Sequence, residues 1–201
     1  MPLSPLQHDA LTEVINIGFG KAAATLSSLT GKRVILNVPE IFLVAPSWID
    51  AALGEVLSGE VTTIHQVFTG KVSGSAVLVL NQDSASILVD LVSGGPGEKR
   101  RLLASDREAL QEIGNILLNA YVGSFGNILN LHIRFAVPQI QPENAAGILI
   151  SLAEDKAALS SILLVKTEFV IGLGQISGYV LIIMGVESLE TLLAAIDTTV
   201  G

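Results

Sequence analysis

Two stretches of this chain share one arrangement of polar residues: "DALTEVIN" at 9–16 and "EALQEIGN" at 108–115. In the first stretch, Asp9, Glu13 and Asn16 stand at i, i+4 and i+7, a spacing that places them on one face of a helix. A single polar face of this kind usually indicates only a solvated helix surface. A second copy of the same face requires a further explanation.

The repeat extends beyond these stretches. Between residues 9 and 41, a shift of 99 positions aligns the chain with itself without a gap. The residues that recur are Ala10, Leu11, Glu13, Asn16, Ile17, Val38, Pro39 and Ile41, which meet Ala109, Leu110, Glu112, Asn115, Ile116, Val137, Pro138 and Ile140. A fixed repeat is the signature of a duplicated architecture. We therefore expect one domain over 1–201, made of two homologous halves (1–95 and 103–201) that a Gly/Pro/basic linker at 93–102 joins.

Each half opens with the signals of a long helix. "SPLQ" at 4–7 and "SDRE" at 105–108 match the capping box, in which a Ser begins the helix and a Gln or Glu follows three residues later. This reading makes Glu108 a capping residue first. Gly31 and Asn130 align with each other and tolerate the left-handed conformation that ends many helices. Asp9 can also be explained as an acid that favours the positive end of the first helix.

The rest of each half is rich in β-strand patterns. Strands are expected at 33–44 and 132–140, each with a Pro that belongs at a sheet edge or a turn. Short helices are expected at 47–53 and within 143–157. Hairpins and closing helices should follow, at 60–68, 73–80 and 82–94, and again at 160–172, 176–184 and 187–197. The fold class is therefore α+β, with a largely antiparallel central sheet, two long helices and shorter helices packed on it, and a pseudo-two-fold axis.

The first long helix should pack inward through the face opposite Glu13, which carries Leu11, Ile15, Gly18, Ala22 and Leu29. The polar face continues with mostly small residues. They are Gly20, Ala23 and Ser27 in the first copy and Asn119, Val122 and Gly126 in the second. Small side chains on this face would let the surface of a protein partner approach closely.

Composition excludes several classes of function. The chain has no Cys, so disulfides and thiolate chemistry are excluded. The formal net charge is −8 and the only basic cluster is at 98–101, so a nucleic-acid partner is not expected. His8, His65 and His132 share no ligand spacing, and we expect no metal site. Without a long apolar run or an export signal, we expect no membrane span and a cytoplasmic location.

The spacing Asp9-x3-Glu13-x2-Asn16-x22-Pro39 resembles the phosphatase signature of the CheC family of chemotaxis proteins, which includes CheC, CheX and FliY. We refer to these four residues as the first site. The second half repeats the spacing as Glu108, Glu112, Asn115 and Pro138, which we refer to as the second site. Glu108 stands where the family has Asp or Ser. CheC fits best, because the chain has two copies and ends without the rotor-type domain of FliY.

The resemblance implies hydrolysis of the aspartyl phosphate of a phosphorylated CheY-type response regulator. Asn16 and Asn115 would each hold a water through one donor and one acceptor of the carboxamide. Glu13 and Glu112 would pair with a Lys or another donor on the docked regulator. Asp9, Glu108, Pro39 and Pro138 would support the two sites. The Mg²⁺ that such chemistry uses is expected on the regulator, with no cofactor bound by this chain itself.

An alternative also follows from the resemblance: a non-catalytic adaptor that binds and regulates the receptor deamidase CheD. The candidate dock is "ISLAEDKAAL" at 150–159, where Glu154 and Asp155 form an acidic tip after an apolar run. Internal duplication already supplies the symmetry that a dimer would give, so a monomer is preferred.

Overall fold

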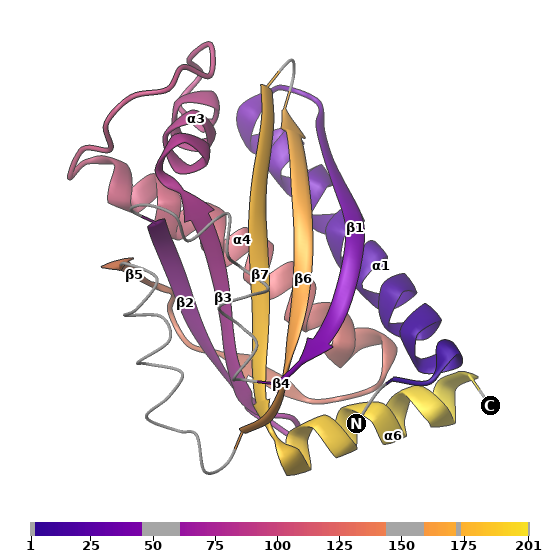
Figure 1. Cartoon of the computed structure of the whole chain (residues 1–201). Helices are drawn as coiled ribbons and strands as arrows, with labels where there is room; N and C mark the ends of the chain where they lie inside the picture. Colours follow the sequence, from indigo (N-terminus) through magenta and orange to yellow (C-terminus); the bar gives the residue numbers. More distant parts are fainter. Residues whose placement is uncertain (1–2, 46–60, 144–158, 172–173, 201) are drawn as a thin grey trace.

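A computed structural model describes residues 3–45, 61–143, 159–171 and 174–200 (Figure 1). The elements in chain order are α1 (Pro5–Thr30), β1 (Val34–Val44), β2 (Val61–Gly70), β3 (Gly74–Asn81), α3 (Gln82–Val92), α4 (Asp106–Ile128), β4 (Ile133–Phe135), β5 (Gln139–Glu143), β6 (Leu159–Ile171), β7 (Gly174–Gly185) and α6 (Val186–Val200). In both halves a long helix comes first, then an outer strand or strands, a hairpin and a closing helix. The predicted duplicated α+β fold is confirmed.

The sheet interleaves the two halves. Its order is β1-β6-β7-β3-β2-β4, with β5 also paired to β2, and every pairing is antiparallel. The hairpins β2–β3 and β6–β7 therefore lie side by side at the centre. The outer strand of each half pairs with the hairpin of the other half: Ile41 faces Val165, and Ile140 faces Ile64. This exchange relates the halves by a pseudo-two-fold axis between β3 and β7.

Helices α1 and α4 lie next to each other on one face of the sheet (Figure 1). The rings of Phe19 and Tyr121 pack with their centroids 4.3 Å apart. A Cβ on Gly18 would lie 2.6 Å from the carbonyl oxygen of Ala120 and 3.0 Å from Ser124 Oγ. The glycine therefore allows the two helices to approach closely at this point.

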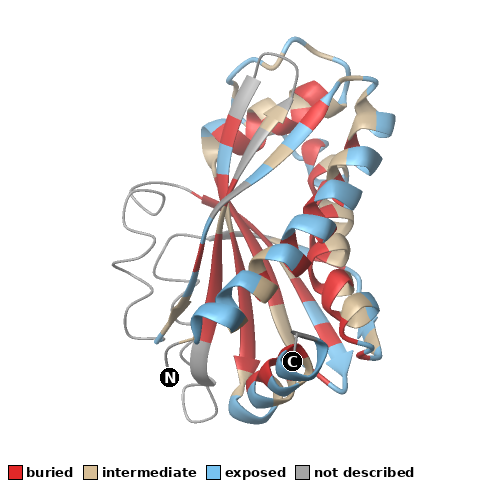
Figure 2. Cartoon of the chain, turned by 90° about the vertical axis from the view of Figure 1, so that its right-hand side faces the viewer, coloured by how far each residue is buried: buried red, intermediate tan, exposed pale blue. Residues whose placement is uncertain are grey.

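The main hydrophobic core lies between this helical layer and the sheet, and its buried residues follow the strands and the inward faces of the helices (Figure 2). Leu11, Ile15 and Ala22 are buried as predicted. The prediction for Leu29 is wrong: it is 49% exposed, and Leu26, at 0%, is buried in the core in its place. A smaller buried cluster occupies the opposite face of the central strands, around Val77, Val79 and Leu181.

The first helix begins and ends as predicted. Ser4 Oγ accepts a 3.1 Å hydrogen bond from Gln7 N, and Gln7 Oε1 accepts one from Ser4 N, which completes the capping box. Gly31 follows α1 with φ 64°, and Asn130 follows α4 with φ 52°. Both helix ends therefore use the left-handed conformation that favours Gly and Asn.

The prediction of a second capping box, at 105–108, is wrong. Ser105 has a helical conformation and its hydroxyl caps nothing. Asp106 is used instead: its carboxylate accepts a 2.7 Å hydrogen bond from Leu103 N and two from the Arg100 guanidinium, at 2.6 and 2.9 Å. These hydrogen bonds close the turn that precedes α4. The residue that makes them is Asp106, one position after the predicted capping residue Ser105. Glu108 consequently has no capping role and is exposed.

The predicted linker is held against the fold by its backbone. Asp90 Oδ2 accepts hydrogen bonds from Gly97 N and Glu98 N, at 2.7 and 3.1 Å. Lys32 Nζ donates a 2.5 Å hydrogen bond to the Gly95 carbonyl oxygen. These contacts lower the pKa of Asp90 below its ordinary value, chiefly through the two backbone donors.

Both prolines of the signature lie where the pairing of the strands is interrupted. Pro39 lies in the edge strand β1, within a register shift between Asn37 and Glu40. Pro138 lies between β4 and β5. Both positions agree with the prediction of an edge or a turn. The predicted helices at 47–53 and within 143–157, and with them Glu154 and Asp155, lie outside the described residues. No helix in the described ranges is long and apolar enough to cross a membrane.

Candidate functional site

The second site forms one pocket. Its volume is about 330 Å³, and we refer to it as the motif pocket. The lining residues come from one face of α4, from the end of β4 and from the segment that joins β4 to β5: Glu108, Gln111, Glu112, Asn115, Phe135, Ala136, Val137 and Pro138. All four residues of the second site are therefore brought together.

The β4–β5 connection is held beside α4 by specific contacts. Ala136 N donates a 2.9 Å hydrogen bond to the Val67 carbonyl oxygen on β2. Pro138 is buried, whereas Val137 is 73% exposed at the pocket. The interruption of the strand at 136–138 thus builds one wall of the motif pocket and leaves an apolar side chain facing outward.

Asn115 is held by a network of amides that no sequence pattern indicates. Gln66, on β2, is only 1% exposed, and its Nε2 donates 3.0 Å hydrogen bonds to Asn119 Oδ1 and to the Ala136 carbonyl oxygen. Asn119 Nδ2 in turn donates a 2.8 Å hydrogen bond to Asn115 Oδ1. Gln66 Nε2 also lies 3.4 Å from Asn115 Oδ1. The carboxamide oxygen of Asn115 is thus engaged inside the protein.

This geometry changes the expected chemistry of Asn115. An amide oxygen has two lone pairs and an amide nitrogen has two protons. Since both contacts that Asn115 makes with the described residues go to Oδ1, the capacity left within this part of the chain is the donor capacity of Nδ2. Glu112 and Glu108 are exposed on the same helix face and supply acceptors. The second site therefore offers a donor from the amide and acceptors from carboxylates.

The first site is more open. Glu13 and Asn16 are exposed on α1, and within the described residues the Asn16 side chain has no hydrogen-bond partner. Asp9 is 86% exposed and lies 3.8 Å from His8 Nδ1. It is not in the first turn of α1, so the helix-end explanation of Asp9 is wrong. Pro39 is placed only as part of the backbone of β1, which packs on α1.

The small-residue face of α1 is open only in part. Gly20 is exposed and a Cβ added to it would meet nothing within 4 Å. Ala23 and Ser27 are half-buried, and Ser27 Oγ accepts a 2.9 Å hydrogen bond from Val34 N. On α4 the prediction for Val122 is wrong, since this side chain is 1% exposed. The chain turns back after Asn130 and covers this end of α4, with Leu131 N donating a 2.9 Å hydrogen bond to the Gly126 carbonyl oxygen. Gly126 is partly covered for the same reason.

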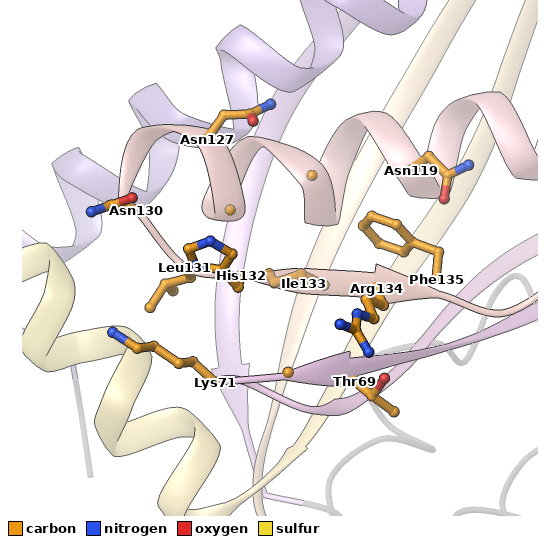
Figure 3. Close-up of a pocket in the computed structure, with 13 residues that line it drawn as sticks. Thr69, Lys71, Asn119, Asn127, Asn130, Leu131, His132, Ile133, Arg134 and Phe135 are labelled. Carbon is orange, nitrogen blue, oxygen red and sulfur yellow. The ribbon is translucent and has the colours of Figure 1, made fainter.

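A larger pocket of about 940 Å³ adjoins the motif pocket, and we refer to it as the basic pocket (Figure 3). Its lining includes Lys71, His132 and Arg134, and none of its described lining residues is acidic. Asn119 lines the basic pocket and Phe135 lines both pockets. Figure 3 shows Lys71 extending toward α6 and Arg134 toward Thr69, so their charged groups do not converge on one point. These residues come from distant segments with no common spacing, which explains why sequence patterns do not reveal them.

Burial and charge shift the pKa values of a few described side chains outside the two pocket linings. The Arg100 guanidinium lowers the pKa of Asp106, and burial raises the pKa of Tyr121 well above its ordinary value. Burial lowers the pKa of His65. Across the described part of the chain, no group of three or more His, Asp or Glu side chains is placed to hold a metal ion.

Among the comparisons with known proteins, the match to a family model falls in the first half of the chain. The model of the CheC-like family matches residues 6–43, the segment that contains the whole first site. The flagellar motor switch phosphatase FliY of Bacillus subtilis is 28% identical over 179 residues, which are 87% of this chain and 44% of FliY. The CheY-P phosphatase CheC of the same organism is 26% identical over 140 residues, 67% of this chain and 65% of CheC. The chain thus spans less than two thirds of either relative.

Solved structures share the whole fold. The crystal structure of FliY from Thermotoga maritima has a TM-score of 0.79 at 22% identity and covers 99% of this chain and 100% of that chain. The FliM middle domain from H. pylori has a TM-score of 0.67 at 16% identity and covers 96% and 99%. The chain therefore has the fold of FliY and of the FliM middle domain. Its relationship to FliY and CheC in sequence confirms the resemblance to the CheC family that the two copies of the motif indicate.

Proposed function

We propose that this chain is a phosphatase that hydrolyses the aspartyl phosphate of a phosphorylated CheY-type response regulator. The reaction would take place at two pseudo-symmetric sites, with Glu13 and Asn16 in one and Glu112 and Asn115 in the other. The observation that carries the proposal is the motif pocket, in which the second-site residues meet although Pro138 lies far from Glu112 in sequence. The names of the two curated relatives, a motor switch phosphatase and a CheY-P phosphatase, support it.

The chemistry of the site suits this reaction. Hydrolysis of a phosphoryl group requires a water in line with the breaking bond and stabilisation of the developing negative charge. Asn115 Nδ2 is free to donate to that water or to a phosphoryl oxygen, and it is held by the network behind it. The Glu112 carboxylate can accept from the water or pair with a cation of the docked regulator. Mg²⁺ on the regulator would supply further charge stabilisation.

The shape of the site favours a protein substrate. The motif pocket is small and lies beside the exposed apolar side chain of Val137. Exposed carboxylates next to an apolar side chain are suited to the rim and centre of a protein interface. The reacting group would therefore arrive on the surface of a folded partner.

The test is the rate at which a phosphorylated CheY-type regulator loses its phosphate, with and without this protein. Wild type should accelerate the loss, and the Asn16→Ala, Asn115→Ala double variant should lose about 10²-fold or more of that acceleration, the usual effect of removing a positioned donor. Asn127→Ala is the matched control, because Asn127 is an exposed asparagine of α4 outside the motif pocket. A wild-type protein without any effect on the rate would overturn the proposal.

A further inference from the structure

Gln66 occupies an unusual place for an amide. It lies on β2 between Ile64 and Phe68, which are buried in the main core, and its side chain is itself buried. Burial of an amide is unfavourable unless hydrogen bonds replace those it makes with water. Here Nε2 makes them, to the Ala136 carbonyl oxygen and to Asn119 Oδ1 at 3.0 Å, with Asn115 Oδ1 further away at 3.4 Å. Gln66 Oε1 is buried and has no hydrogen-bond partner among the described residues. The buried amide thus connects the core to the motif pocket.

The direction of the hydrogen bonds in this network follows from the one backbone group in it, the Ala136 carbonyl. The Ala136 carbonyl oxygen can only accept, so the Gln66 group facing it must be the donating Nε2. Asn119 must then present Oδ1 to Gln66, and this leaves Asn119 Nδ2 to face Asn115. Asn115 consequently receives the hydrogen bond on Oδ1 and directs Nδ2 away from the network. One carbonyl group therefore sets the orientation of all three amides.

The first site lacks both supporting residues. The position that aligns with Asn119 at the shift of 99 is Gly20, which has no side chain. Ile64 on β2 faces Ile140, and Val165 on β6 faces Ile41. Because Ile41 and Ile140 are 99 positions apart, Ile64 corresponds to Val165. Gln66, two residues after Ile64, therefore corresponds to Thr167 on β6. A threonine hydroxyl is shorter than a glutamine amide and cannot replace its two donors. Asn16 is exposed and takes part in no such network among the residues that the structure describes.

We propose that Gln66 and Asn119 are positioning residues that fix Asn115 with its amide nitrogen toward the substrate, and that the two sites are therefore unequal. This inference rests on the phosphatase proposal and adds residues outside the family signature. A donor that is already oriented does not have to lose rotamer freedom when the partner docks. The second site should thus exceed the first about three- to tenfold in rate, the usual effect of one immobilised side chain.

The most selective variant is Asn119→Asp. The carboxylate has the size of the amide and still accepts from Gln66, but it cannot donate to Asn115 Oδ1. Asn115 should then turn its nitrogen inward, toward the new acceptor. Asn127→Asp is the matched control, because it makes the same charge change on an exposed asparagine of the same helix. Both variants should be made in an Asn16→Ala background, so that only the second site is measured.

Two readouts distinguish positioning from a general loss of structure. In the rate assay, Asn119→Asp should lower kcat three- to tenfold or more with little change in KM, whereas Asn127→Asp should leave kcat unchanged. By NMR, the Asn115 side-chain amide protons should exchange rapidly with water in wild type and more slowly in Asn119→Asp. The NMR readout does not require phosphatase activity, so it tests the positioning even if the proposed function fails.

A second variant guards against misfolding. Gln66→Met keeps most of the buried volume and removes both donors, so the protein should remain folded while Asn115 loses its fixed orientation. Its thermal unfolding should stay cooperative and its kcat should fall as in Asn119→Asp. Equal kcat values for Asn119→Asp, Gln66→Met and Asn127→Asp, or an unchanged exchange rate of the Asn115 amide, would overturn the inference. A slowed exchange with an inactive wild-type protein would overturn only the phosphatase proposal.

Discussion

Asn119 Nδ2 donates a 2.8 Å hydrogen bond to Asn115 Oδ1, and this contact between successive turns of α4 separates two pockets. Asn115 lines the motif pocket, and Asn119 lines the basic pocket. The side chain that orients the candidate catalytic asparagine is thus itself exposed to a second hollow of the surface. The same relationship is absent from the described part of the first half, because Gly20 occupies the aligned position.

Close packing of the two long helices predicts opposite effects at two glycines of α1. Gly18→Ala should lower the free energy of unfolding by about 1–3 kcal/mol, because the new methyl group meets the backbone of Ala120. Gly20→Ala should raise it by about 0.4–1 kcal/mol, because the added Cβ has open space and the unfolded chain loses freedom. Urea denaturation measures both. Equal stability of the two variants would show that α1 and α4 are not in contact at Gly18.

The two helix starts predict a difference between two serines. Ser4→Ala should cost about 1 kcal/mol of stability, because Ser4 Oγ caps the Gln7 N–H. Ser105→Ala should change stability by less than about 0.5 kcal/mol, because the Ser105 hydroxyl caps nothing. Thermal unfolding followed by circular dichroism can compare them. A larger loss of stability for Ser105→Ala than for Ser4→Ala would show that Ser105 does cap α4, against the structure.

The Asp106–Arg100 contact predicts a pH-dependent contribution to stability. The pKa of Asp106 is lowered in the folded protein, chiefly by its hydrogen bonds with Arg100, so the charged carboxylate stabilises the fold above its unfolded pKa of about 3.9. That contribution is lost as pH falls through the lower folded pKa. At pH 7, Asp106→Asn should be about 1.5–3 kcal/mol less stable than wild type. The difference should shrink below about pH 4.

The control for this prediction is Asp83→Asn. Asp83 pairs with Lys99 at 2.6 Å, but both side chains are more than half exposed, so its loss should change stability by less than about 1 kcal/mol. Urea denaturation at pH 7, 5 and 3 compares the three proteins. A gap between wild type and Asp106→Asn that persists undiminished well below pH 4 would contradict the proposed origin of the effect.

Local signals predicted much of this fold. Ser4, Gly31 and Asn130 mark helix boundaries through their own backbone and side-chain chemistry, and such signals do not depend on the rest of the chain. The exchange of outer strands between the halves was not predicted, because strand order depends on contacts between residues far apart in sequence. Ser105 was misread because its neighbour Asp106 has a stronger partner in Arg100, which no local pattern shows.

The site was predicted only in part, because its spacing can be seen in the sequence and its long-range contacts cannot. Glu112, Asn115 and Pro138 were found because their spacing repeats, and the structure places them in one pocket. Gln66 was missed because one polar residue in a strand usually faces solvent, whereas here α4 covers that face of the sheet. Only the tertiary structure brings Gln66 to Asn115.

The most direct test of two unequal sites is the decay rate of a phosphorylated CheY-type regulator with wild type and with each single variant, Asn16→Ala and Asn115→Ala. Both variants are expected to keep part of the acceleration, and Asn115→Ala is expected to lose the larger share. Full activity in both variants would contradict the assignment of the two asparagines. A larger loss in Asn16→Ala would contradict the proposed advantage of the second site.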